Sequence, residues 1–351
     1  MNFTTASGGR CVNGWSTWLL LGCTVVSLPP SLAAEDLPPS HSVTPELFAT
    51  GLAFAEGPAF DVQGNLYVVN YRVIGTIGRI TPDGAASIWC DLNKASPVEG
   101  RKVQANGLKV DSENRLIAAD AGGGRVLRIS PDGQQVEVLA DRCDGVRFDA
   151  INDVALDRTG NIYFTDPGSS TAEKPTGSVY RYDIRTKKTT KLATGLAYPN
   201  GIAVTPDQTQ LCVGESDRYR LLIFDLDKAT GGVREPRVLI DFPQETQGNI
   251  LGGKFSPDGF VFDDSARLYV AMWLGGVVNV VDLASGNLLR QYSAGGSQVT
   301  NCHFHGSYLY TTVAAKEAVF RLKLGIKGCP YWIPLPAGNR GSGGTAENEQ
   351  E

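Results

Sequence analysis

The chain has 351 residues with a formal net charge of −5 at pH 7, and no dense run of lysine and arginine. This charge pattern argues against nucleic acid as a partner. Its 41 glycines and 20% charged residues favour a turn-rich structure over a helical one. The length would accommodate two average domains, but all-β folds of this size often form one.

The first 34 residues are predicted to be a secretory signal peptide. Residues 15–28 are mostly apolar, and small residues precede an expected cleavage after Ala33 or Ala34. The apolar run is too short and too interrupted by proline to span a bilayer. The protein is therefore expected to be exported, either to the periplasm or to the medium. Lipid anchoring at Cys23 is the less favoured alternative.

A four-strand unit recurs along the chain at a period of about 45 to 55 residues. It consists of a short apolar strand, a second strand rich in Tyr, Val and Thr, a glycine-flanked third strand and an outer fourth strand. The second strands are expected at residues 65–70, 115–120, 161–166, 210–215, 267–272 and 308–313. Six such units predict an all-β fold, a six-bladed β-propeller with four antiparallel strands per blade.

The segment from Glu46 to Ala53 resembles the segment from Lys191 to Ala197, which is a fourth strand in mid-chain. The amino-terminal strand is therefore expected to complete the last blade, which closes the ring and removes an exposed edge. This predicts a linker over residues 35–44, the propeller over 45–326 and a partly disordered tail over 327–351.

An acid or amide residue stands at the start of the first strand in five repeats. The next strand begins ten residues later in four repeats and eleven later in the fifth, counted from Glu56, Asn106, Asn152, Asp258 and Asn200. Since first strands line the channel of a propeller, these side chains are expected to converge at one end. Turn chemistry explains any one of them taken alone, whereas their common position in the repeat favours a shared binding site.

Two carboxylates with several amide oxygens suit a hard divalent cation. Ca²⁺ is the expected ion, with Mg²⁺, Mn²⁺ and Zn²⁺ as alternatives. Signal cleavage would leave five cysteines, none in CxxC spacing, so a thiolate zinc site is not supported. No Gly-x-Ser-x-Gly elbow is present, and the two histidines of the folded region give a Ser-His-Asp triad few ways to form.

Over about residues 47–324 the chain resembles the SMP-30/gluconolactonase/luciferin-regenerating-enzyme family, and it is also similar to the squid-type diisopropylfluorophosphatase. The motifs that carry the resemblance are Glu56-Gly57-Pro58, Asn152-Asp153, Asn200-Gly201 and Pro257-Asp258-Gly259. The resemblance implies a six-bladed propeller in which Glu56, Asn200 and Asp258 bind the metal.

The resemblance also implies roles for the remaining candidates. Asn152 would be a metal or substrate ligand, and Asp258 would act as base or nucleophile as well as ligand. Asp153 and His303 are predicted to contact the substrate. Asn106 is not a firm ligand in the family, and its place in the repeat predicts that it lines the pocket. For His303 three roles stay open, namely structural packing, substrate contact and proton transfer.

The expected activity is a metal-dependent lactonase of the gluconolactonase type. The ion would polarise the lactone carbonyl, and Asp258 would take a proton from the attacking water. One alternative is a non-catalytic propeller that binds a ligand or protein around a structural metal. Another is hydrolysis of a phosphotriester or fluorophosphate. The expected partner is a small-molecule substrate, and the oligomeric state stays open.

Overall fold

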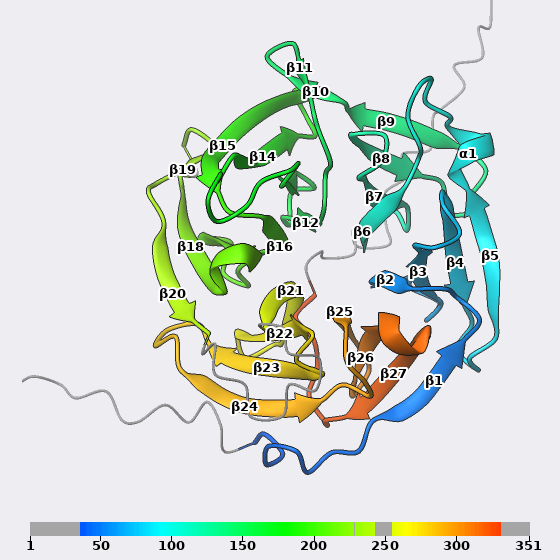
Figure 1. Cartoon of the computed structure of the whole chain (residues 1–351), viewed down its shortest axis with the longest axis vertical. Helices are drawn as coiled ribbons and strands as arrows, with labels where there is room; N and C mark the ends of the chain where they lie inside the picture. The colour runs from blue at the N-terminus through cyan, green and yellow to red at the C-terminus, as the bar shows by residue number, and fades with distance from the viewer. Residues whose placement is uncertain (1–35, 228, 243–254, 331–351) are drawn as a thin grey trace, which may run out of the picture. The chain divides into compact units, whose positions relative to one another are not determined.

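Six small antiparallel sheets stand around a central axis in the computed structural model (Figure 1). The structure describes residues 36–227, 229–242 and 255–330, which all fall in one compact unit. The six-bladed β-propeller predicted from the repeats is confirmed. The predicted signal peptide and all but the first four residues of the predicted tail lie outside the described residues.

Blades 1 to 5 take their strands in chain order from the axis outward. Blade 1 contains β2 (Ala55–Phe60), β3 (Leu66–Asn70), β4 (Thr76–Ile80) and β5 (Ala86–Asp91). Blade 2 contains β6 (Ala105–Val110), β7 (Leu116–Asp120), β8 (Arg125–Ile129) and β9 (Val136–Ala140). Blade 3 contains β12 (Val154–Leu156), β13 (Ile162–Asp166), β14 (Gly177–Asp183) and β15 (Lys188–Leu196).

The second half of the ring repeats this pattern. Blade 4 contains β16 (Pro199–Val204), β17 (Gln210–Glu215), β18 (Arg220–Asp227) and β20 (Arg237–Asp241), with the short β19 (Gly232–Val233) also paired to β18. Blade 5 contains β21 (Ser256–Phe262), β22 (Arg267–Trp273), β23 (Val277–Asp282) and β24 (Leu288–Ser293). Blade 6 contains β25 (Val299–His305), β26 (Tyr308–Val313) and β27 (Ala318–Lys323).

The amino-terminal strand β1 (Glu46–Thr50) supplies the fourth strand of blade 6. It pairs antiparallel with β27, with Glu46 opposite Arg321 and Thr50 opposite Ala318. Figure 1 shows this pairing as blue β1 beside orange β27. The predicted ring closure is therefore confirmed, and the outer edge of β27 is covered.

Few other elements interrupt the blades. They are α1 (Leu92–Ala95), the hairpin of β10 (Arg142–Cys143) and β11 (Val146–Arg147), and the 3₁₀ turns η2 (Ser216–Arg218) and η3 (Ala314–Lys316). None of the helices in the described ranges has the length and apolar character required to cross a bilayer. The five cysteines of the described residues are all free thiols.

The hydrophobic core is divided among the contacts between neighbouring blades. One cluster joins Tyr67 and Ile77 of blade 1 to Leu108 and Leu116 of blade 2, and all four side chains are at most 4% exposed. The first strands β2, β6 and β12 are buried along their whole length. Because both faces of these strands pack against protein, the residues at their ends are held on rigid elements.

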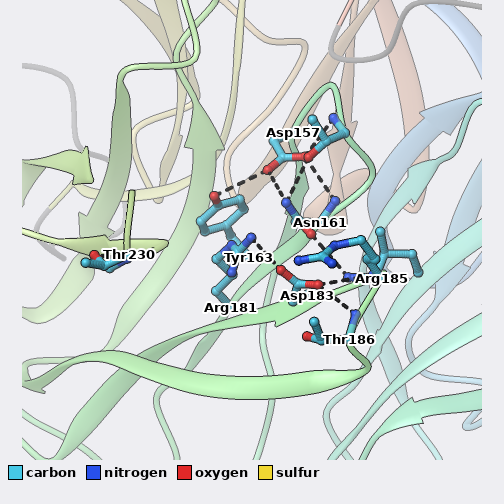
Figure 2. A network of polar contacts seen from close by, with 11 residues as sticks. Asp157, Asn161, Tyr163, Arg181, Asp183, Arg185, Thr186 and Thr230 are labelled. Carbon is cyan, nitrogen blue, oxygen red and sulfur yellow. Dashed lines mark hydrogen bonds and ion pairs between the residues drawn. The ribbon is translucent and has the colours of Figure 1, made fainter. Parts of the chain in front are cut away.

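An aspartate closes the turn between the first and second strands in several blades, as Figure 2 shows for blade 3. Asp157 Oδ1 accepts the backbone N–H groups of Thr159 and Asn161 at 2.9 and 3.0 Å. Its Oδ2 accepts the Asn161 amide at 2.8 Å, and Asn161 Oδ1 in turn accepts the N–H of Ile184. This network ties the inner hairpin of the blade to its outer hairpin.

Part of the predicted linker packs on blade 5. Leu37 is only 4% exposed, and the Tyr292 hydroxyl donates to the carbonyl of Pro38 at 2.8 Å. Arg267 Nη2 lies 3.0 Å from Asp36 Oδ2. Residues 36–38 therefore belong to the packed unit that carries the blades.

Candidate functional site

The first strands carry a β-bulge at the same height in five blades. In blade 1 the segment from Glu56 to Ala59 faces the shorter segment from Val69 to Tyr67, so β2 holds one extra residue. The same irregularity occurs in β6, β16, β21 and β25. In blade 3, β12 begins only after Asn152 and Asp153. Bulges redirect side chains and are common beside active sites.

The glycines after the candidate ligands allow neighbouring blades to approach at the axis. A Cβ on Gly107 would collide with the Asp153 carboxylate, and one on Gly201 would collide with the carbonyl oxygen of Asp258. The Asn-Gly and Asp-Gly pairs are thus required by packing around the axis and not only by turn geometry.

Hydrogen bonds between blades hold the backbone of this end in place. The N–H of Gly107 donates to the carbonyl of Asn152 at 2.8 Å. The hydroxyl of Thr165 donates to the carbonyl of Asn200 at 2.7 Å, and that of Ser216 to the carbonyl of Pro257 at 2.6 Å. Three candidate ligand positions are thereby fixed, directly or through the preceding residue, by the blade before them.

One cavity of about 330 Å³ at this end is lined by residues from all six blades. It contains the five residues expected to converge, namely Glu56, Asn106, Asn152, Asn200 and Asp258. The other residues that line it are Phe54, Tyr71, Tyr198, Ser216, Asp217, Ser256, Trp273 and Thr300. Residues separated by about two hundred positions in the chain thus share one site.

Two of the three carboxylates that line the cavity, those of Glu56 and Asp258, are buried and have strongly perturbed pKa values. Burial raises the pKa of Glu56 to about 8, and the charge of Asp153 adds to the rise. Burial also raises the pKa of Asp258 well above its usual range, with further contributions from the charges of Glu56 and Asp153. A side-chain hydrogen bond with Asn200 acts in the opposite direction. A cation bound beside these two buried carboxyl groups would reduce the repulsion between them.

The donor set fits a hard divalent cation. Glu56, Asp153 and Asp258 bring three buried carboxylates to the channel, and buried Lys109 brings one ammonium. Within the part of the channel that the structure describes, the buried carboxylates therefore outnumber the buried ammonium groups, which favours a bound cation. The described residues contain no cluster of three or more His, Cys, Asp or Glu suited to a metal. The ion would therefore depend on the amide oxygens of Asn152 and Asn200.

Asp153 lies outside the lining of this cavity. Its side chain is 2% exposed, its Oδ1 accepts the N–H of Val154 at 2.8 Å, and Lys109 Nζ stands 3.9 Å from the same oxygen. Burial raises the pKa of Asp153, whereas the Lys109 charge lowers it. These contacts place Asp153 within the channel wall and not at the surface where a substrate would enter.

His303 lines a different cavity, of about 380 Å³, together with Phe60, Asp61 and His305. Its Nδ1 is 2.9 Å from the carbonyl oxygen of Phe304. Burial lowers the pKa of His303 to about 3, so the imidazole is neutral near pH 7 and is a weak base. The structure therefore separates His303 from the five residues that line the first cavity.

Four aromatic residues of the first cavity were not identified from the sequence. Phe54 and Tyr198 stand two positions before Glu56 and Asn200. Tyr71 directly follows the second strand β3, and Trp273 is the last residue of the second strand β22. The repeat pattern that located the ligands would also have located these positions. Their side chains are only partly buried.

The fold and this cavity define a six-bladed β-propeller with a site rich in oxygen ligands at one end of its channel. Residues 54–315 match the family model described as the SMP-30/gluconolactonase/LRE-like region. Because the match covers well over half of the sequence, the chain belongs to this family.

Individual relatives agree with this assignment. The chain is 28% identical over 294 residues to a gluconolactonase of Zymomonas mobilis, covering 79% of this chain and 80% of the relative. It is 27% identical to the diisopropyl-fluorophosphatase of Loligo vulgaris, covering 77% and 88%. A solved calcium-binding protein, regucalcin of Agrobacterium tumefaciens, is 21% identical, with a TM-score of 0.63 over 81% of this chain and 97% of that one. This last likeness concerns the fold alone.

Proposed function

We propose that this protein is a divalent-metal-dependent hydrolase that opens a small lactone. The observation that carries the proposal is the cavity in which two buried carboxylates meet three asparagine side chains. Similarity to a gluconolactonase over four fifths of both chains supports a lactone as the substrate. Membership of the family supports the same class of chemistry.

The ion would be held by Glu56, Asn152, Asn200 and Asp258, and Ca²⁺ suits this all-oxygen set best. When bound there, a divalent cation polarises the lactone carbonyl and stabilises the negative charge that develops on its oxygen. Asn106 lines the same cavity and is left to orient the substrate.

Asp258 is the residue proposed to take the proton from the attacking water. Its carboxylate is buried, and its hydrogen bonds with Asn200 and with the N–H of Gly259 fix its orientation. Glu56 is oriented in the same way by the N–H of Gly57. Fixed carboxylates need no reorganisation during the reaction, which lowers its barrier.

The test is hydrolysis of glucono-δ-lactone by the purified chain before and after treatment with EDTA, followed by addition of Ca²⁺, Mg²⁺, Mn²⁺ or Zn²⁺. We expect turnover that EDTA abolishes and that Ca²⁺ restores best. Lactone hydrolysis insensitive to the chelator would overturn the metal dependence. A bound ion without any turnover would favour a propeller that only binds ligands.

Hydrolysis of a phosphorus ester is the second candidate. Similarity to a diisopropyl-fluorophosphatase over 77% of the chain favours it, since an ion that polarises C=O also polarises P=O. Diisopropyl fluorophosphate in the same assay separates the two reactions. A higher kcat/KM for this compound than for every lactone tried would replace the lactonase proposal.

A further inference from the structure

Four partly exposed aromatic residues line the cavity that holds the carboxylates, and we call Phe54, Tyr71, Tyr198 and Trp273 the aromatic wall. The Phe54 ring centroid is 5.3 Å from that of Tyr71 and 6.0 Å from that of Trp273. These three rings come from blades 1 and 5, so they make a continuous apolar surface across two blades. Tyr198 of the loop before β16 adds a fourth ring to the lining.

The backbone that presents two of these rings is in an unfavourable conformation. Phe54 has φ of 57° and Tyr198 has φ of 55°, in the left-handed region that bulky residues rarely adopt. Each stands two residues before a candidate ligand, Glu56 or Asn200. Strained residues of this kind persist when the surrounding structure enforces them, and they gather at functional sites.

The rest of the described lining offers no cation to an anionic substrate, and two of its hydroxyl groups are already engaged. Among the described residues that line the cavity there is no lysine, arginine or histidine. Ser216 donates its hydroxyl proton to Pro257, and Thr300 donates to the carbonyl of Ala55 at 3.0 Å. The polar groups that remain, apart from the residues proposed to hold the ion, are those of Asn106, Asp217, Ser256 and the two tyrosine hydroxyls.

We propose that the aromatic wall selects lactones whose substituent is apolar and uncharged, such as an aryl or alkyl group, over polyhydroxylated or phosphorylated sugar lactones. The inference rests on the proposed lactonase function and concerns the part of the substrate that does not react. Its physical basis is that an apolar substituent gains from burial against the rings, whereas each hydroxyl left without a partner in the cavity loses its hydrogen bonds to water. A phosphate would also meet the negative charge of Asp217, and no cation is among the described residues that line the cavity. The nearby Arg72 lies over the Phe54 ring and is already paired with Glu317.

The first experiment compares kcat/KM for dihydrocoumarin, δ-valerolactone, glucono-δ-lactone and 6-phosphoglucono-δ-lactone, using the full chain with added Ca²⁺. Each value is divided by the rate constant for spontaneous hydrolysis, because the lactones differ in reactivity. We expect this ratio to be highest for dihydrocoumarin, by about tenfold or more over glucono-δ-lactone, and lowest for the phosphorylated compound.

The variant Trp273→Leu keeps an apolar side chain but removes the ring. It should lower kcat/KM for dihydrocoumarin by about tenfold and leave that for δ-valerolactone almost unchanged. Trp273→Phe should restore most of the loss. The matched control is Trp89→Leu, since Trp89 is also half-buried but packs on Tyr67 in the outer part of blade 1, with ring centroids 4.6 Å apart.

A binding measurement separates this inference from the lactonase proposal. Calorimetry with the unreactive lactam 3,4-dihydroquinolin-2-one should show tighter binding than with δ-valerolactam, and Trp273→Leu should remove the difference. Equal affinity for the two lactams, or an equal loss of affinity for both in the variant, would overturn the proposed selectivity of the aromatic wall even if lactones are hydrolysed. Failure to hydrolyse any lactone, with the lactam preference intact, would overturn the lactonase function and leave a wall that recognises apolar rings.

Discussion

The first strands carry acidic or amide residues at both of their ends, and the residues at the two ends have different roles. At the cavity end are Glu56, Asn106, Asn152 and Asp258, and five positions later, at the turn end, are Asp61, Asp111, Asp157 and Asp263. At the turn end, each carboxylate accepts two backbone N–H groups of its own turn, as Asp157 and Asp263 do at 2.9 to 3.0 Å. At the cavity end, Glu56 and Asp258 are buried beside each other's charge.

The difference shows how a structural acid is distinguished from a functional one on a single strand. The acids at the turn end find their partners within four residues, so local structure satisfies them. Those at the cavity end are brought together from separate blades. Burial raises the pKa of Asp263 as well as the pKa values of Glu56 and Asp258, but Arg267 opposes the rise at Asp263, whereas the charges of neighbouring acids add to it at the cavity end. The second environment is suited to an ion and a substrate.

The largest effect is expected at Asp258. Asp258→Asn should lower kcat for the lactone by roughly 10²- to 10⁴-fold, because the amide cannot accept the proton of the attacking water. Steady-state kinetics at saturating Ca²⁺ measure the change. Asp157→Asn, at the turn end of blade 3, is the matched control and should retain its kcat. Full activity of Asp258→Asn would refute its assigned role.

Glu56→Gln should weaken the metal site. Removing one of the two buried carboxylates proposed to hold the ion lowers the attraction for it, and we expect an increase in Kd for Ca²⁺ of at least about tenfold. Elemental analysis and calorimetry give occupancy and affinity. Asn106→Ala, in the same cavity but not a proposed ligand, should keep the metal. Unchanged ion content in Glu56→Gln would remove this residue from the ligand set.

Asp157→Ala tests the turn end of the comparison. The variant leaves the N–H groups of Thr159 and Asn161 and the Asn161 amide without their acceptor. We expect the free energy of unfolding to fall by about 1–3 kcal/mol, measured by urea denaturation, with kcat per folded molecule unchanged. A loss of kcat at full stability would contradict the structural role of this aspartate.

The smallest effect overall is expected at His303. Since His303 lines the opposite cavity and its pKa is lowered to about 3 by burial, His303→Gln should leave kcat/KM and its dependence on pH between 5 and 9 nearly as in the parent. Any change should appear in the thermal midpoint. Loss of an inflection in the pH profile would instead assign proton transfer to this histidine.

The sequence by itself determined the number of blades, the strand that closes the ring and the five positions that converge. These features follow from local rules, because turn chemistry and the spacing of apolar strands repeat along the chain whatever surrounds them. The sequence alone therefore shows that five residues occupy the same position in their repeats, namely Glu56, Asn106, Asn152, Asn200 and Asp258.

Tertiary structure alone decided which of the remaining side chains come into contact and which cavity His303 lines. His303 stands on a first strand as Asp258 does, but it lies further along the strand and so faces the other cavity. Phe54 and Trp273 are more than two hundred residues apart and become neighbours only because blades 1 and 5 bring their rings together. Such contacts depend on bulges and on packing between blades, and neither follows from the residue types along one strand.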